Sequence, residues 1–151
     1  MKKVNAFALL SVFSLIVLVP LLFVIRLIPT EEGYKTVKIS GVTVKAEVAD
    51  TQLKRIEGLM SKKALPHNGG MLFIFDAADY HRIWMMNMNF SIDILWIGKD
   101  LKIVDIAESA PPCILNCPVY SPDEKSLYVL EVNAGFVNEN KLKIGDQVEI
   151  S

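Results

Sequence analysis

The chain contains few of the side chains that usually bind metals or perform nucleophilic catalysis. It has two histidines and two cysteines among 151 residues. His67 and His81 each lie in or beside a predicted loop, which gives poor support to a histidine-based zinc or copper site. No Gly-x-Ser-x-Gly motif for a serine nucleophile occurs. The sequence therefore predicts no metal and no cofactor.

Positive charge is sparse as well, and it forms no cluster. The first 33 residues hold three basic and two acidic residues, which leaves 13 basic and 15 acidic residues in the remainder. A near-neutral domain without a basic run has no electrostatic attraction for nucleic acid. We therefore expect no nucleic-acid partner.

A long uncharged run lies near the N-terminus. Residues 6–25 carry no charge, and only two serines and one proline interrupt their apolar side chains. Twenty residues at the helical rise span roughly 30 Å, the thickness of the hydrocarbon core of a bilayer. We therefore expect one transmembrane helix that contacts the membrane through residues 6–25.

The flanks of this run predict its orientation. Lys2 and Lys3 precede it and Arg26 follows it, which favours a cytoplasmic N-terminus in the cell membrane. Cleavage by signal peptidase is the alternative, but no small-x-small site follows the run. The expected parts are a single-pass signal anchor at 1–28, a linker at 29–33 and an extracytoplasmic domain at 34–151.

The two cysteines agree with an extracytoplasmic domain. Cys113 and Cys117 lie four positions apart in a proline-rich segment. Outside the cytoplasm, such a pair most simply forms a disulfide. The spacing differs from the Cys-x-x-Cys of thioredoxin-type proteins, and a zinc site would need two more ligands. We expect a structural disulfide, with redox and metal roles as the alternatives.

The domain sequence predicts an all-β fold with one short helix. Short apolar or alternating segments are separated by turn residues, and no long amphipathic helix occurs, which is typical of a small β-sandwich or barrel. Asp50 is the expected N-cap and Gly58 the expected C-cap of the helix, with Leu53 and Ile56 on its inner face. The expected strands are 36–39, 42–48, 71–75, 81–86, 92–97, 101–106, 127–132 and 147–150.

The stretch 80–97 is the densest part of this domain. It holds both tryptophans and three of the six methionines. Thioethers can bind Cu(I), but strand alternation points Met85 and Met86 to opposite faces, which favours packing. We expect a central hairpin in which Trp84, Met85 and Trp96 pack.

Several sequence blocks resemble those of one known family, the domain-of-unknown-function 192 family of bacteria and archaea. The blocks are Arg55 to Met60, Gly70 to Phe75, Trp84 and Met85 with Asn87, Ile92 to Ile97, Pro112 and Cys113 with Cys117, Pro118 and Tyr120, Leu130 and Glu131, Ala134 and Gly135, and Gly145 and Asp146. The resemblance implies a compact, mainly β fold, often secreted or membrane-anchored, with no established activity. Where the family usually reads Trp-Met-Lys-Asn-Thr, with a proline before Leu-Asp, this chain has Met86, Met88 and Ser91. The departure removes a cation and a hydroxyl.

Five of the matched side chains could form a site: Arg55, Trp84, Asn87, Asp93 and Glu131. An arginine beside a carboxylate can form a bidentate ion pair, and an adjacent aromatic face can hold a sugar ring or a cation. Two carboxylates can also act as general acid and base. The structural alternative is that Arg55 pairs with Asp93 or Glu131 and fixes the helix to the sheet.

From these features we expect a membrane-anchored binding or accessory module of the cell envelope, with polysaccharide, peptide or a protein partner as the ligand. The alternative is a hydrolase of envelope glycans that acts through Asp93 and Glu131. A third class, a metal or redox protein, would require Cys113 and Cys117 to be reduced and accessible. A closed arginine–carboxylate pair buried under Trp84 would indicate a structural role instead.

Overall fold

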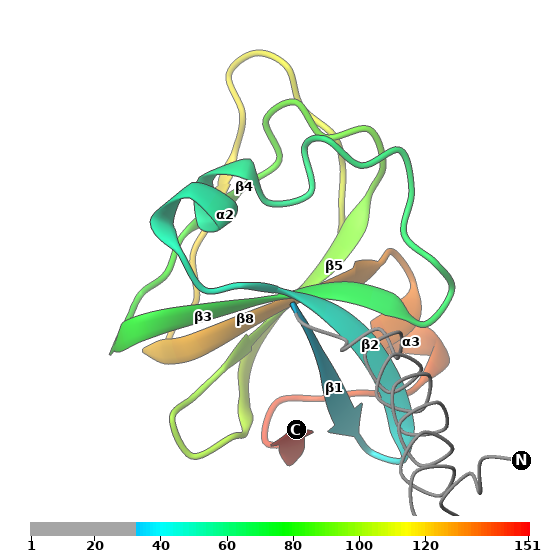
Figure 1. The fold of residues 1–151 in the computed structure, drawn as a ribbon, viewed down its shortest axis with the longest axis vertical. Coiled ribbons are helices and arrows are strands. Elements are labelled where there is room, and N and C mark those ends of the chain that lie inside the picture. Colours follow the sequence, from blue (N-terminus) through cyan, green and yellow to red (C-terminus); the bar gives the residue numbers. More distant parts are fainter. Residues whose placement is uncertain (1–32) are drawn as a thin grey trace, which may run out of the picture. The chain divides into compact units, whose positions relative to one another are not determined.

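Residues 33–151, the part of the chain that the computed structural model describes, are mostly β (Figure 1). Their strands and helices are β1 (Tyr34–Ile39), β2 (Val42–Ala49), α2 (Gln52–Glu57), β3 (Gly69–Asp79), β4 (Ile83–Trp84), β5 (Ile92–Ile97), β6 (Ile103–Ala110), β7 (Val119–Tyr120), β8 (Ser126–Asn133), α3 (Phe136–Glu139) and β9 (Val148–Ile150). The predicted signal anchor at 1–28 lies outside the described residues. Neither helix within residues 33–151 is long and apolar enough to cross a membrane.

One curled sheet of seven strands forms the body of the domain. The strands lie in the order β6-β5-β8-β3-β2-β1-β9, and β2 and β3 are the parallel pair in an otherwise antiparallel sheet. The two end strands come together where Lys102 and Gln147 form an isolated antiparallel bridge. Within residues 33–151 the sheet is therefore a half-barrel, which agrees in part with the predicted sandwich or barrel, whereas a sandwich of two large facing sheets is not formed there.

Alternating side chains and a two-residue turn produce the hairpin of β1 and β2. Ile39 pairs with Val42 across Ser40 and Gly41, whose φ angles are both positive at 48° and 87°. Turns with this backbone match the twist of antiparallel strands. Within β2, Val44 is buried and both of its neighbours are less buried. The hairpin predicted from the sequence is confirmed.

The sheet buries apolar side chains on both faces. Leu72 and Leu130 belong to a core that also contains side chains of α3, so we name this side the α3 face. Phe73 and Trp96 belong to a second core on the opposite side, the α2 face. Successive side chains of a strand point to opposite faces, which explains why Leu72 and Phe73 enter different cores.

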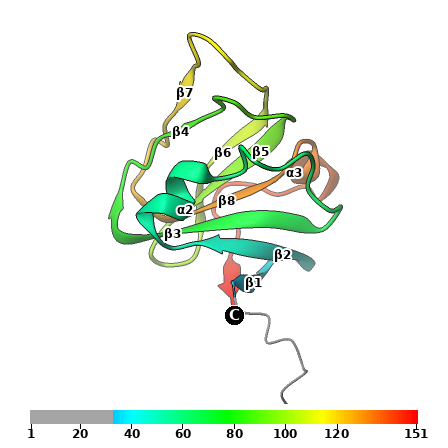
Figure 2. The ribbon, with the colours of Figure 1, turned by 45° about the horizontal axis from the view of Figure 1, so that its top comes forward.

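A layer of short elements covers the α2 face. Helix α2 and strand β4 lie on the same side of the sheet in both views (Figures 1 and 2), and Figure 2 shows β7 beside β4, with which it forms a two-stranded ribbon. Leu59, which follows α2, and Ile83 and Met85, from and beside β4, are buried in the core of this face. This layer replaces the second sheet of a sandwich.

Several local predictions differ from the structure. The segment 81–86 was expected to pair with 92–97, but β4 pairs with β7, so the central hairpin is wrong. Strand β3 extends from Gly69 to Asp79, beyond the predicted bounds 71–75, with an irregularity in its pairing to β8. Strand β5, in contrast, has the predicted bounds.

Candidate ligand-binding site

Strand β8 places the carboxyl group of Glu131 on the α2 face. Glu131 lies opposite Ile94 of β5, and directly opposed residues of antiparallel strands share a face. Strand β3 runs very close on the other side. A Cβ added to Gly70 would lie 2.7 Å from the backbone oxygen of Glu131, so this position requires glycine.

Glu131 is buried without a polar partner. Its relative exposure is 4%, and no group within residues 33–151 donates a hydrogen bond or forms an ion pair with its carboxyl group. Burial raises its pKa from the usual 4.5 to about 8. Desolvation acts on the ionised form, which no neighbouring charge offsets. The carboxyl group is therefore mostly protonated at neutral pH.

Helix α2 forms one wall of the site. Its N-cap is Thr51, whose hydroxyl accepts a hydrogen bond from the Lys54 N–H at 3.3 Å, so the prediction of Asp50 as N-cap is wrong. Asp50 instead forms a 2.9 Å ion pair with the Lys54 ammonium group. Gly58 ends the helix with a φ of 49° and a ψ of −131°, so its φ is positive but the expected left-handed helical C-cap is not formed. The chain then passes close to Phe73, because a Cβ added to Gly58 would lie 3.4 Å from the Phe73 Cζ atom.

Arg55 fixes the helix to the sheet through backbone carbonyl groups. Its Nη1 donates 2.8 Å hydrogen bonds to Asp50 O and Ile74 O, and its guanidinium lies 5.3 Å from the ring centroid of Phe75. A weaker contact of 3.9 Å joins Nη2 to the exposed carboxylate of Asp76. The pairing of Arg55 with Asp93 or Glu131, expected as the structural alternative, is not formed.

The two apolar side chains of α2 face solvent. Leu53 is 81% exposed and Ile56 is 60% exposed, so the prediction that they form the inner face is wrong. The helix has no buried residue, and Arg55 is the half-buried one. Because the guanidinium turns toward the carbonyl of β3, the helix rotates its apolar side chains outward.

Trp84 borders the site from the β4 side. It pairs with Val119 of β7, and the two side chains are 53% and 54% exposed. The prediction that Trp84 packs in the core is therefore wrong, whereas Met85 and Trp96 are buried as predicted. A surface depression of about 340 Å³ is lined by Arg82, Ile83, Trp84 and Val119.

A smaller cavity of about 80 Å³ lies between α2, β4 and β8. Arg82, Ile83 and Trp84 line both this cavity and the surface depression, so the two spaces adjoin the same segment of the chain. We name the cavity and the depression together the Glu131 site. The cavity is lined by Arg55, Ile56, Glu57, Gly58, Leu59, Met60, Phe73, Arg82, Ile83, Trp84, Met85, Met88 and Glu131.

The Glu131 site contains three of the five predicted site residues: Arg55, Trp84 and Glu131. The closed ion pair expected for a structural role is absent from it within residues 33–151. The sequence did not single out Phe73, Arg82 or Glu57 as lining residues. Glu57 could have been identified from the sequence, because it belongs to the matched block from Arg55 to Met60 and every residue of that block lines the cavity. Arg82 belongs to none of the matched blocks.

Asp93 lies on the opposite face of the sheet. It is directly opposite Val132, which belongs to the core of the α3 face. Its carboxylate accepts hydrogen bonds from the backbone N–H groups of Ser109 at 2.8 Å, Gly135 at 3.2 Å and Val137 at 2.8 Å. Asp93 therefore ties β5 to the end of β6 and the start of α3, and it does not form an acid–base pair with Glu131.

Asn87 lies in the turn after β4 and is exposed. Its φ of 58° is in the left-handed region, which asparagine adopts more readily than most residues. Its backbone N–H donates a 2.9 Å hydrogen bond to Cys113 O. These contacts assign Asn87 a role in the turn, and it does not line the cavity.

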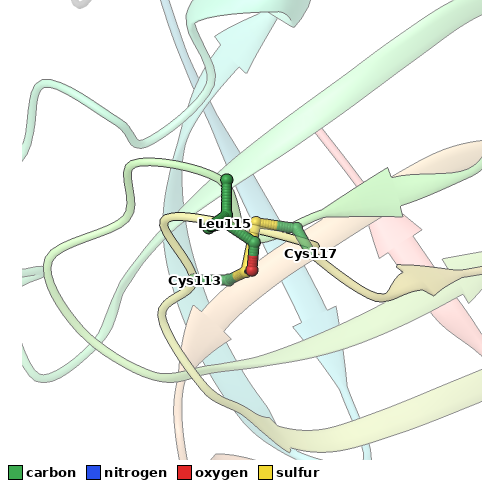
Figure 3. Close-up of a disulfide and its surroundings, with 3 residues drawn as sticks. All are labelled: Cys113, Leu115 and Cys117. Carbon is green, nitrogen blue, oxygen red and sulfur yellow. A yellow bond between two sulfur atoms is a disulfide. The ribbon is translucent and has the colours of Figure 1, made fainter.

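A disulfide joins Cys113 and Cys117, whose Cα atoms are 5.4 Å apart (Figure 3). The closed loop lies beside β4, because Cys113 N–H donates a 3.0 Å hydrogen bond to Met85 O. Ile114 and Leu115 at its tip are 83% and 81% exposed. Within residues 33–151, no group of three or more histidine, cysteine or acidic side chains could hold a metal ion.

Similar proteins carry the same domain. The UPF0127 protein TK1120 of Thermococcus kodakarensis is 27% identical over 109 residues, and a UPF0127 protein of Thermococcus gammatolerans is 26% identical over 107 residues. These matches cover 69% and 68% of this chain. In both cases they span 63% of the length of the relative.

Two solved structures have similar folds. A protein of unknown function from Novosphingobium aromaticivorans has a TM-score of 0.69 and 30% identity, over 77% of this chain and 83% of its own. A Sinorhizobium meliloti protein described as a candidate transcription regulator has a TM-score of 0.71 and 33% identity, over 80% of this chain and 98% of its own. The family model DUF192, described as "Uncharacterized ACR", matches residues 35–150. The chain therefore belongs to the DUF192 family.

Proposed function

We propose that this chain is a binding or accessory module of the cell envelope, with polysaccharide, peptide or a partner protein as its ligand at the Glu131 site. The observation that carries the proposal is a buried, unpartnered carboxyl group in a cavity whose wall continues to an exposed tryptophan. An unpaired buried polar group costs free energy, and a ligand that reaches it removes this cost. An exposed aromatic face beside it supplies apolar contact area.

The same geometry argues against a glycan hydrolase. Glycoside hydrolysis usually needs two carboxyl groups on either side of the scissile bond, roughly 5–10 Å apart across one cleft. Asp93 and Glu131 lie on opposite faces of the sheet, and three backbone N–H groups occupy the Asp93 carboxylate. Glu57 is the other acidic residue of the cavity, but it is exposed at the end of α2.

The envelope location rests on the sequence. The uncharged run at 6–25 is long enough to span a bilayer, and the paired cysteines suit an oxidising compartment. We infer a single-pass anchor with a cytoplasmic N-terminus and an extracytoplasmic domain. The domain is near-neutral and has no basic run, which disfavours nucleic acid, the kind of partner that a transcription regulator binds.

Membrane fractionation tests the anchor. The full chain is expected in the carbonate-resistant membrane pellet, and a chain that lacks residues 1–28 is expected in the soluble fraction. Added protease should degrade the domain in spheroplasts whose inner membrane is intact. Full protection of the domain in spheroplasts would contradict an extracytoplasmic location.

Nuclear magnetic resonance tests ligand binding with a built-in control. The chain has two indole N–H groups, one on exposed Trp84 and one on buried Trp96, whose Nε1 donates a 2.7 Å hydrogen bond to His81 O. Purified envelope polysaccharide or envelope peptide should shift the Trp84 signal and leave the Trp96 signal in place. The Trp84→Phe variant assigns the signals. If neither ligand shifts Trp84, or both signals shift equally, binding at this site is refuted.

A further inference from the structure

The interior of the cavity has one vacant hydrogen-bonding group. Apolar side chains surround Glu131, among them Phe73, Met85 and Met88. The other titratable groups that line the cavity are Arg55 and Glu57 on α2 and Arg82 before β4. The Arg55 guanidinium is held by two backbone carbonyl groups, and Glu57 and Arg82 are exposed.

The charges of this lining select among ligands. Glu57 and Arg82 are exposed and have opposite signs, and the Arg55 guanidinium already donates to two backbone carbonyl groups. Inside the cavity, an anionic group would find the neutral Glu131 acid as a hydrogen-bond donor but no unpaired cation among the buried lining residues, and a neutral hydroxyl would lose its water shell for one hydrogen bond. An ammonium group would convert the carboxyl group into a charge-assisted pair in surroundings of low dielectric constant.

We propose that the Glu131 site binds ligands through an ammonium group, which enters the cavity and pairs with the Glu131 carboxylate. This inference rests on the proposed binding function and specifies its ligand chemistry. Trp84 and Phe73 line the cavity, and an aromatic face turned toward a cation held there would add cation–π attraction. A volume of about 80 Å³ admits an ammonium group with its first carbon atoms, while the rest of the ligand lies in the depression beside Trp84.

Pairing moves one proton. In the empty site Glu131 is a neutral acid at neutral pH, because burial raises its pKa to about 8. When R–NH3⁺ binds, the Glu131 O–H bond breaks, the carboxylate keeps the electron pair and the proton passes to solvent. The affinity for an ammonium ligand therefore rises roughly 50-fold from pH 6 to pH 8. A ligand that needs the neutral acid binds equally well at pH 6 and 7 and loses affinity above pH 8.

Titration of the full chain, in detergent micelles, with butylammonium tests this inference. We expect a shift of the Trp84 indole signal, an affinity that rises with pH as above, and release of nearly one proton per ligand at pH 6.5. Calorimetry in buffers of different ionisation enthalpy measures that proton. Butanol, which has a similar shape and no charge, should bind at least tenfold more weakly.

Two variants separate the carboxyl group of the cavity from a carboxyl group outside the site. Glu131→Gln should abolish both the proton release and the pH dependence. Glu108→Gln should retain both, because Glu108 is exposed on β6 and does not line the cavity or the depression. The Trp96 indole signal reports whether each variant is folded. Equal binding of butanol and butylammonium, or unchanged proton release in Glu131→Gln, would overturn the inference.

Natural sources of the ammonium group are compared at pH 6.5. A lysine tripeptide and a glucosamine trisaccharide are titrated beside their N-acetylated forms, and loss of binding on acetylation identifies the source. If an acetylated polysaccharide or peptide still shifts Trp84, the binding function stands and the ammonium inference fails. If no ligand shifts Trp84, both fail.

Discussion

Replacement of Glu131 by glutamine should stabilise the protein at neutral pH. In the unfolded chain the carboxyl group ionises near its usual pKa of 4.5, and in the folded chain near 8. Below pH 4.5 it is protonated in both states, so its ionisation does not change the stability. Between pH 4.5 and pH 8, each pH unit lowers the free energy of unfolding by about 1.4 kcal/mol, because the unfolded state alone gives up the proton.

The size of the effect follows from these two values. The difference in pKa of 3.5 units corresponds to about 5 kcal/mol of lost stability above pH 8, and the loss at pH 7 is about 3 kcal/mol. Glutamine has nearly the same shape and does not ionise. We therefore expect Glu131→Gln to be about 3 kcal/mol more stable than the wild type at pH 7 and equally stable at pH 4.

Urea unfolding followed by the fluorescence of buried Trp96 measures the difference at pH 4, 5.5, 7 and 8.5. Glu108→Gln is the matched control, because Glu108 is an exposed glutamate of β6, and it should change stability by less than about 0.5 kcal/mol. A Glu131→Gln variant that is less stable than the wild type at pH 7 would refute the reasoning. That result would mean that the ionised carboxylate has a partner in the folded protein.

Two further predictions concern the contacts that support the site. Asp93→Ala leaves three backbone N–H groups without an acceptor, so it should lower the free energy of unfolding by at least about 3 kcal/mol; a loss below 1 kcal/mol would show that the carboxylate is not needed there. Replacement of both Cys113 and Cys117 by serine opens a small loop and should cost about 2 kcal/mol in urea unfolding. Full labelling of both thiols in the native wild type without reductant would contradict the disulfide.

The apolar and alternating segments predicted the positions of most strands, but not the order in which they pair. Strand β5 has its predicted bounds, and the hairpin of β1 and β2 follows from its alternating side chains and the turn at Ser40 and Gly41. Pairing partners that are distant in the sequence were not predictable in this way. Trp84 pairs with Val119, 35 positions later, and nothing local to either residue specifies that ribbon.

The candidate site was predicted in part for a related reason. Arg55, Trp84 and Glu131 line one cavity, but Asp93 does not. Whether Asp93 and Glu131 share a face depends on the register of β5 against β8, and a shift of one residue moves a side chain to the other face. The sequence shows both carboxyl groups, but it does not determine the register that decides which face each one occupies.

The orientation of α2 depends on the contacts of Arg55, which the helical spacing of the apolar residues does not predict. Leu53 and Ile56 have the spacing of an inner face, but a six-residue helix buries little area through them. The two hydrogen bonds of Arg55 to backbone carbonyl groups, with its position over Phe75, determine which side turns inward. An arginine between two apolar residues can therefore be the anchoring residue of a short helix.

The most direct test of a neutral, unpartnered Glu131 in a ligand site is the titration of its carboxyl carbon by ¹³C nuclear magnetic resonance. Glu131→Gln assigns the signal. Without ligand, its pKa should be about 8, and saturation with butylammonium should lower it by more than one unit. A pKa near 4.5 in the ligand-free protein would contradict the account, because the carboxyl group would then be hydrated or paired.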